Sequence, residues 1–153
     1  PTTSCVITRS SAGSIFIATT GPGLFSADGS GTGTGLISVI HRDESGNDVW
    51  STAFSDQSGA MAPAPISMSD PSKQVYLQLY GTGIRPVNGA AGVTAQVGGA
   101  AVAVDSAVAH GSLSGSDEIR VGPLPQGLAG SGLATVTVTA GGRESNAVTV
   151  NIQ

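Results

Sequence analysis

The chain is organised by short runs in which apolar and polar residues alternate with a period of two. In residues 74–80 (QVYLQLY), Val75, Leu77 and Leu79 alternate with two tyrosines and a glutamine. Residues 146–152 (NAVTVNI) repeat the pattern near the end of the chain. Alternation of this kind is typical of a β-strand with one buried face, and no window shows the 3.6-residue period of a helix. The sequence therefore predicts an all-β protein.

The remaining strands are predicted where β-branched residues lie between turn-forming residues. They are residues 4–8, 14–19, 36–42, 48–54, 93–97, 100–105, 117–121 and 134–139. We expect two hairpins, one joining 36–42 to 48–54 and one joining 134–139 to 146–152. Residues 26–35 are predicted to be a flexible glycine loop, and residues 55–72, with three prolines, a long surface connection. About nine or ten short strands with frequent turns favour an immunoglobulin-like β-sandwich.

Composition adds to this picture. Aromatic residues make up 4% of the chain, so we expect a thin core of Val, Ile and Ala and modest stability for an isolated subunit. The net charge is −4, and the six basic residues are scattered without forming a patch. This distribution disfavours nucleic-acid binding. The longest apolar run is too short for a membrane span.

The start of the chain and its cysteine bear on location. The chain begins at Pro1, and the simplest interpretation is a processed protein whose leader has been removed. Few lysines and many Ser, Thr and Gly residues suit a secreted protein at a bacterial surface. Cys5 is the one cysteine, which leaves two interpretations. It is a small buried apolar side chain, or a thiol that is free, modified or bonded to another chain.

Several motifs occur in an order that resembles a known family. They are GPGLFSADGSGTG (21–33), VYLQLYGTGIRPV (75–87), VTAQVGGAAVAV (93–104) and DEIRVGPLPQGLAGSGLATVTVTAGGRESNAVTVNIQ (117–153). Together they resemble an uncharacterised C-terminal domain at the ends of many large secreted proteins of soil acidobacteria. The second half is similar to immunoglobulin-like domains of the IPT/TIG type. The resemblance covers residues 21–153 and implies no enzyme activity.

The resemblance also implies a domain boundary. It places the start of the β-sandwich domain at residue 21, with residues 1–20 as an N-terminal extension. In longer family members, the residues before PGLF close the last strand of a preceding domain, and here we expect that domain to be missing. The stretch between the glycine loop and the YGTG strand, which includes HRDESGNDVW, departs from many family members.

No motif points to catalysis or to a cofactor. The two histidines, His41 and His110, match no catalytic signature, so we expect a protein that is not an enzyme. The GSGTGTG run lacks the lysine and the helix that a phosphate loop requires. We predict no cofactor and no metal site, and there is no Cys/His set for zinc.

Two weaker binding signals remain. The turn containing Asp43, Glu44 and Asp48 would offer oxygen ligands to a calcium ion, but a solvated hairpin tip is the better interpretation. Trp50, Tyr76 and Tyr80 are the few aromatic candidates for sugar stacking, and Tyr76 and Tyr80 would give a small platform on a strand that faces solvent, although core or interface packing is favoured for them. A secreted adhesin or carbohydrate-binding module that contacts surface glycans is therefore the alternative function.

The apolar N-terminal run, residues 4–19, leads to the main functional hypothesis. One interpretation makes it the first strand of its own sandwich. The other makes it a strand without a domain, donated to the sheet of a neighbouring copy. Head-to-tail donation that does not close a ring builds a filament. The predicted donor residues are Val6, Ile7, Ile15, Phe16 and Ile17, and the predicted hinge is Gly21-Pro22-Gly23. We expect a pilus-like homopolymer outside the cell.

Overall fold

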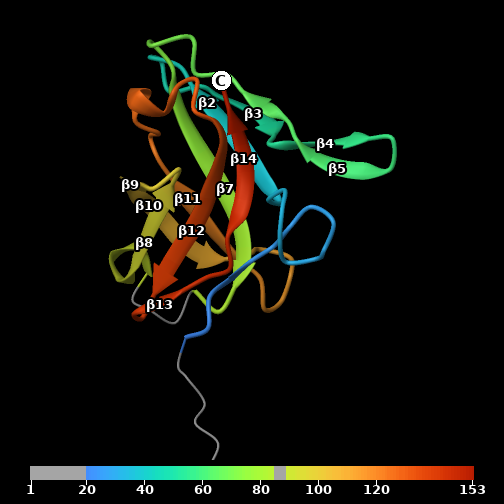
Figure 1. Ribbon diagram of the computed structural model, residues 1–153. Coiled ribbons are helices and arrows are strands. Elements are labelled where there is room, and N and C mark those ends of the chain that lie inside the picture. Colours follow the sequence, from blue (N-terminus) through green and yellow to red (C-terminus); the bar gives the residue numbers. More distant parts are fainter. Residues whose placement is uncertain (1–19, 85–88) are drawn as a thin grey trace, which may run out of the picture.

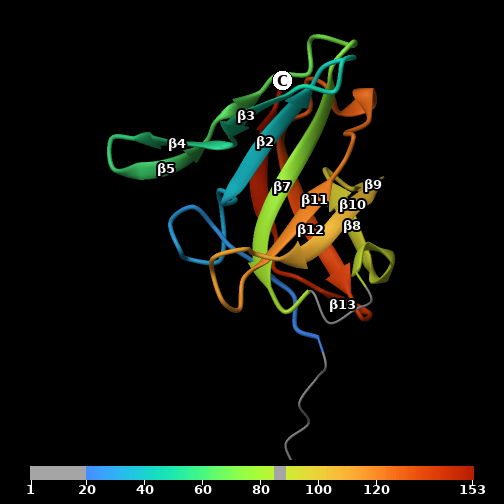
Figure 2. The same ribbon diagram turned by 180° about the vertical axis from the view of Figure 1, so that it is seen from behind.

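The protein folds as two β-sheets packed face to face with an aliphatic core between them (Figures 1 and 2). The computed structural model describes residues 20–84 and 89–153. The predicted all-β sandwich is confirmed. The predicted strands 4–8 and 14–19 lie outside the described residues.

The first sheet has the order β10-β11-β7-β2-β3, and every neighbouring pair in it is antiparallel. Its strands are β2 (Ile37–Arg42), β3 (Asp48–Thr52), β7 (Gln74–Thr82), β10 (Val104–Ala109) and β11 (Asp117–Val121). The short strand β1 (Gly23–Leu24) pairs with the last residues of β7, beyond the end of β2. The predicted pairing of 36–42 with 48–54 is confirmed as the β2–β3 hairpin.

The second sheet has the order β6-β14-β12-β8-β9. Its strands are β6 (Pro65–Ile66), β8 (Val93–Val97), β9 (Ala100–Val102), β12 (Gly132–Ala140) and β14 (Val148–Ile152), and β13 (Arg143–Glu144) pairs with the end of β12. β6 runs parallel to β14, and the other pairs are antiparallel. Two 3₁₀ helices, η1 (Gly89–Gly92) and η2 (Gln126–Leu128), lie in the connections. The predicted closing hairpin is confirmed as β12–β14.

The chain moves between the two sheets in the order of an immunoglobulin-type domain. It places β7, β10 and β11 in the first sheet and β8, β9, β12 and β14 in the second. β2 takes the place beside β7 that the first strand of an immunoglobulin domain occupies. The strands cross the sandwich because each has one apolar face, and both faces must be buried in the same core.

The core is built from aliphatic side chains, and its described members include no aromatic residue. The predicted inner face of β7 is confirmed, because Val75, Leu77 and Leu79 all belong to the core. The other face of β7 is also covered: Tyr76 and Gln78 are 7% and 5% exposed. Side chains of the first sheet therefore form a second packed layer on its outer surface.

Residues 55–72 lie mostly at the surface, as predicted, but they contain strands that the sequence pattern did not predict. The segment begins with a hairpin, β4 (Phe54–Gln57) and β5 (Ala60–Pro63), and continues into β6. Its turn residues Ser58 and Gly59 both have positive φ, 60° and 90°, which suits a two-residue hairpin turn. The hairpin projects from the side of the sandwich (Figure 1). The prolines concealed it, because they stand at strand ends and in an edge strand, where proline is tolerated.

Residues 100–105 do not form one strand as predicted. The chain leaves the second sheet after Val102 and joins the first sheet at Val104, which begins β10. β10 then continues to Ala109, a strand that the sequence pattern did not predict. The run of alternating Ala and Val is uniform across the crossing, so its periodicity does not mark the change of sheet.

The glycine loop 26–35 was predicted to be flexible, but hydrogen bonds hold it closed. The Asp28 carboxylate accepts the hydroxyls of Ser26 and Ser30, each at 2.8 Å, and the Ser30 amide at 3.0 Å. The Ser26 hydroxyl accepts the amide of Gly31. Thr34 also forms a parallel bridge with Thr149 in β14. The hydrogen bonds close the loop on itself, and the bridge to Thr149 joins it to the second sheet.

Candidate functional site

The predicted donor residues and the thiol lie outside the described part of the chain. They are Val6, Ile7, Ile15, Phe16, Ile17 and Cys5. Their roles stay predictions. The site is therefore built from the described residues that a donated strand would meet.

The predicted hinge, Gly21-Pro22-Gly23, lies along the end of β7. The Gly21 amide donates to the Gly83 carbonyl at 3.4 Å, and Gly23 pairs with Thr82. A side chain on Gly81 or Gly83 would collide with the backbone carbonyl of Gly23 or Gly21, respectively. The glycines of the YGTG motif therefore allow residues 21–23 to approach β7 closely. A hinge at these residues stays a prediction, and any pivot would have to break this pairing or lie before it.

Residue 20 and the β2–β3 turn lie at opposite ends of the sandwich. Gly23 pairs with Thr82 at the last residue of β7, whereas Arg42 pairs with Gln74 at its first residue. Nine residues of β7 separate these points, which corresponds to roughly 27 Å along the strand. In Figure 1 the blue start of the described chain lies at the bottom and β2 and β3 near the top.

The four edge strands of the two sheets differ in how they are protected. β6 has two residues, one of them Pro65, and β9 has three. β10 has a register shift between Val104 and Ser106, and η1 packs against it. Short length, proline and bulges are common ways to prevent an edge from pairing with another strand.

β3 has none of these protections. It has five residues, keeps a regular register with β2, and contains no proline or lysine. Val49 and Trp50 are 66% and 51% exposed. Its one charged residue, Asp48, is neutralised by Arg42 through two hydrogen bonds of 2.7 and 2.9 Å. Among the edges that the structure describes, β3 is the one that combines a regular register with two exposed large apolar side chains.

Backbone groups on the free side of β3 are oriented for pairing. The amide of Ala53 donates to the carbonyl of Ile37 at 2.9 Å, which fixes the phase of the ladder with β2. In an antiparallel pair the hydrogen-bonded residues alternate. The amides of Val49 and Ser51 therefore face β2, and those of Asp48, Trp50 and Thr52 face away from it.

The outer side of β3 belongs to the second packed layer. Ile40 lies opposite both Trp50 and Tyr76 and is fully buried although it points away from the core. The Arg120 guanidinium lies 5.8 Å from the Trp50 ring centroid, and that of Arg42 lies 5.1 Å from the Tyr76 ring centroid. The aromatic rings are thus partly covered by arginines, an arrangement with a modest cation–π contribution.

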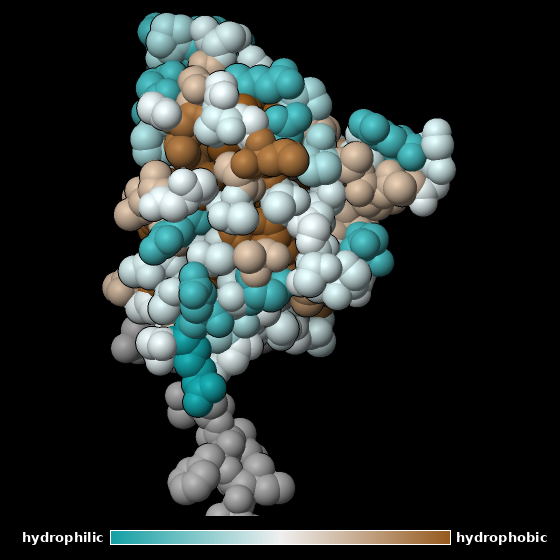
Figure 3. All heavy atoms as spheres, in the orientation of Figure 1, coloured by the Kyte–Doolittle hydropathy of each residue, from teal (hydrophilic) through white to brown (hydrophobic). Residues whose placement is uncertain are grey.

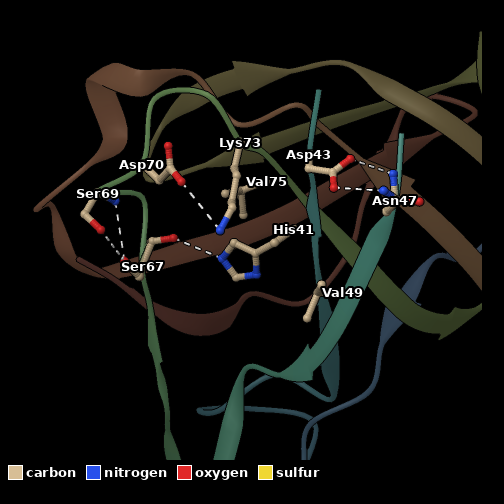
Figure 4. Close-up of a pocket in the computed structure, with 9 residues that line it drawn as sticks. All are labelled: His41, Asp43, Asn47, Val49, Ser67, Ser69, Asp70, Lys73 and Val75. Carbon is tan, nitrogen blue, oxygen red and sulfur yellow. Dashed lines mark hydrogen bonds and ion pairs between the residues drawn. The ribbon is translucent and has the colours of Figure 1, made fainter. Parts of the chain in front are cut away.

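The inner side of β3 borders a pocket of about 440 Å³ (Figure 4). His41 lies opposite Val49 in β3 and Val75 in β7, so all three point to the same side as the core. The other wall is the segment 67–73, which carries Ser67, Ser69, Asp70 and Lys73.

Polar groups around this pocket are already paired. His41 Nε2 lies 3.0 Å from the Ser67 carbonyl oxygen, and Lys73 lies 3.5 Å from Asp70. Asp43 accepts the backbone amide and the side-chain amide of Asn47 (Figure 4). The bonds from Asn47 hold the pKa of the Asp43 carboxyl below its usual value, and a side-chain bond from Ser72 is the largest cause of the lowered pKa of Asp70.

The acidic turn uses its carboxylates within the hairpin. Asp43 bonds to Asn47, and Asp48 bonds to Arg42, which lowers the pKa of Asp48 and raises that of Arg42. In the part of the chain that the structure describes, no group of three or more His, Cys, Asp or Glu side chains is placed to hold a metal ion. The described residues also contain no helix that is long and apolar enough to cross a membrane.

His110 lies between a carboxylate and a hydroxyl, a combination that the sequence did not reveal. Its Nε2 lies 3.4 Å from Glu118, and its Nδ1 lies 3.5 Å from the Ser112 hydroxyl. Nδ1, however, accepts the backbone amides of Ser112 and Leu113 at 3.2 and 3.1 Å. Its lone pair is committed to shaping this turn and is a poor acceptor for the hydroxyl proton that nucleophilic catalysis would transfer.

Comparisons with protein-family models, with curated proteins and with solved structures find no match to this chain. The family resemblance carried by the sequence motifs therefore stays a prediction.

Sequence reasoning missed Val49 as a site residue, and it treated Trp50 only as a sugar-stacking candidate. The alternation in residues 48–54 marks a strand but does not show which side of it is unpaired. The projecting hairpin also went unrecognised, so the strand that precedes it could not be placed at an edge. The signal that was available is the absence of lysine and proline from DVWST.

Proposed function

We propose that the protein is a structural subunit that assembles head to tail with copies of itself by β-strand addition outside the cell. Residues 4–19 of one copy, with Val6, Ile7, Ile15, Phe16 and Ile17, would add to the free edge of β3 in the next copy. The observation that carries the proposal is this edge, which is regular, exposed and apolar.

The positions of the two partners support a head-to-tail arrangement. The chain joins the sandwich at one end of β7, and the β2–β3 turn lies at the other end. Nineteen residues span at most roughly 65 Å when extended, which is enough to reach a neighbouring copy. A donor and an acceptor on different surfaces of one molecule give a heterologous interface, which builds a filament when its rotation does not close a ring.

Unpaired backbone groups and exposed apolar side chains favour the addition of a strand to this edge. An added strand supplies partners to the outward amides of Asp48, Trp50 and Thr52 and removes Val49 from water. It would also enlarge the core, whose described members include no aromatic residue.

Deletion of residues 1–19 tests the proposal. The full chain is expected to form fibres visible by electron microscopy, and the shortened chain is expected to remain monomeric by light scattering. Circular dichroism of the shortened chain is the control for folding, since residues 20–153 include the whole described core. Fibres from the shortened chain would contradict the proposal.

A saccharide-binding module is the second candidate, favoured by the exposed ring of Trp50 beside Arg120. The burial of Tyr76 and the arginine over Trp50 reduce the aromatic surface left for a sugar. Binding of the shortened chain on a glycan array, abolished by Trp50→Ala, would support this candidate. Equal binding by the wild-type and Trp50→Ala proteins would contradict it.

A further inference from the structure

The pocket beside Val49 is continuous with the free edge of β3. Asn47 and Val49 form one of its walls, and both belong to the β2–β3 hairpin. A strand added to this edge would therefore place its inward-facing side chains at the opening of the pocket.

The lining of the pocket suits an aliphatic side chain better than a charged ligand. The histidine, the lysine and the two carboxylates each have a partner within the protein. Val75 forms part of the base of the pocket, and Val49 is exposed at its margin. The part of the lining that stays uncovered is the aliphatic surface of Val49 at its margin.

The alternation of side chains decides which donor residues reach the pocket. Along a strand, residues i and i+2 share a face, so in a donated strand Ile15 and Ile17 would point to one side and Phe16 to the other. The inner side of β3 carries Val49 and the small residue Ser51. Its outer side carries Trp50 above the buried Ile40.

We infer that the pocket beside Val49 receives the side chain of Ile15 or Ile17 from the neighbouring copy, and that Phe16 faces the Trp50 side of the sheet. This inference rests on the proposed function and adds to it the face of the donor that enters the core. It holds for either direction of the added strand, because the alternation is the same in both.

Phe16 favours this choice of face. On the outer side, an aromatic ring would extend the layer formed by Trp50 and Ile40, and aromatic or β-branched pairs across strands stabilise a sheet. With the opposite face inward, both isoleucines would lie on the outer surface and the aromatic ring would have to enter a pocket whose rim is crossed by the bond from His41 to Ser67.

Disulfide trapping between two full-length variants tests the inference. The background carries Cys5→Ser, which removes the native cysteine. One population carries Val49→Cys, and the other carries Ile15→Cys, Phe16→Cys or Ile17→Cys. Cysteines form a disulfide readily only when their Cα atoms lie within about 7 Å, as directly opposed side chains on one face do. After mild oxidation of an equimolar mixture, covalent dimers are counted on a non-reducing gel.

Ile15→Cys or Ile17→Cys is expected to give at least about tenfold more dimer with Val49→Cys than Phe16→Cys gives. A dominant product from Phe16→Cys would overturn the inference, and so would fibres that yield none of the three dimers. In either case the proposed function would survive, because assembly itself would be intact.

A double variant that carries both cysteines in one chain tests whether the N-terminal segment contacts Val49 of its own copy. If this variant forms the disulfide at monomer mass while the mixture forms no dimer, the segment fills the pocket of its own copy. That result would overturn both the inference, which places the side chain in the pocket of a neighbouring copy, and head-to-tail assembly.

Discussion

At the scale of single residues, the side chain of Asn146 binds the backbone of two segments that lie far from it in the sequence. Its side-chain oxygen accepts the amide of Leu24 at 2.8 Å, and its side-chain nitrogen donates to the carbonyls of Leu24 and Gly31 at 2.9 and 2.7 Å. One side chain near the end of the chain thereby holds both β1 and the glycine loop. This explains how a segment rich in glycine is ordered beside β14.

Asn146→Ala is expected to lower the free energy of unfolding by about 2–3 kcal/mol, because three partly buried hydrogen bonds are each worth about 1 kcal/mol. Urea unfolding followed by the fluorescence of Trp50, the one tryptophan, measures the change. Asn151→Ala is the matched control, since the Asn151 side chain makes no hydrogen bond within the described residues. Equal stability of the two variants would contradict the role of Asn146.

Asp28 makes the stability of the glycine loop depend on pH. Hydrogen bonds from the amide and hydroxyl of Ser30, followed by the hydroxyl of Ser26, lower the pKa of Asp28 from 3.8 to about 2. Since the folded state holds this proton less tightly than the unfolded state, the stabilisation is complete above about pH 4. It is lost as the pH falls through about 2.

Asp28→Asn is therefore expected to reduce the fall in melting temperature between pH 4 and pH 2. Scanning calorimetry at several pH values measures it, with Asp105→Asn as a control that removes the same charge from β10. Asp43, Asp48 and Asp70 also have lowered pKa values, so some dependence on pH will persist. An unchanged slope in Asp28→Asn would show that the loop does not hold the carboxylate in solution.

At the scale of elements, β3 is the described edge strand best suited to pairing with an added strand. The other described edges are short, contain proline or have a shifted register, whereas β3 has five regular residues with exposed apolar side chains. The same strand supplies one wall of the pocket. A charged side chain on the inner side of β3 is therefore the substitution that tests association through this edge most directly.

Val49→Lys is expected to raise the concentration at which fibres begin to form by at least about tenfold. A charge on the inner side of an edge strand cannot be buried by an added strand without a large cost. Val49 is 66% exposed, so the stability of the monomer should change by less than about 0.5 kcal/mol. Light scattering during assembly gives the threshold.

Leu133→Lys is the matched control for this change. Leu133 is 72% exposed on β12, a central strand of the second sheet, so it exchanges a similar apolar surface for the same charge away from any edge. The outer face of that sheet shows mostly hydrophilic and intermediate atoms, with hydrophobic atoms towards its upper part (Figure 3). An equal rise in threshold for both variants would show that general surface hydrophobicity, not the edge, drives assembly.

At the scale of the whole molecule, the described chain begins at one end of β7, and the β2–β3 turn lies at the other end, so the proposed donor and acceptor are separate parts of the chain. Each can therefore be removed without the other: deletion of residues 1–19 removes the donor and leaves β3, and Val49→Lys impairs the acceptor and leaves the donor. Head-to-tail assembly predicts that one copy of each variant binds one copy of the other and that no further copy is added.

A mixture of the shortened chain with full-length Val49→Lys is expected to give a 1:1 heterodimer, while each alone stays monomeric. Analytical ultracentrifugation measures the masses. Growth beyond a dimer, or the absence of a dimer while wild-type fibres form, would contradict the assignment of donor and acceptor to these two surfaces.

The sequence by itself determined the local structure of the clearly alternating strands. Alternation in 74–80, 93–97 and 146–152 located β7, β8 and β14, because the period of two is a property of the strand and needs no partner. It also determined that the core would be aliphatic, since few aromatic residues are present. Glycine and polar turns marked most of the strand ends for the same local reason.

Only the tertiary structure decided the order of the strands, and with it the candidate site. Whether a strand lies at an edge depends on pairing between distant segments, which local periodicity does not contain. The change of sheet after Val102, the contact of Asn146 with Leu24 and the open side of β3 all arise in this way. Val49 became a candidate site residue because no described strand lies beyond β3, a fact about its neighbours and not about its own residues.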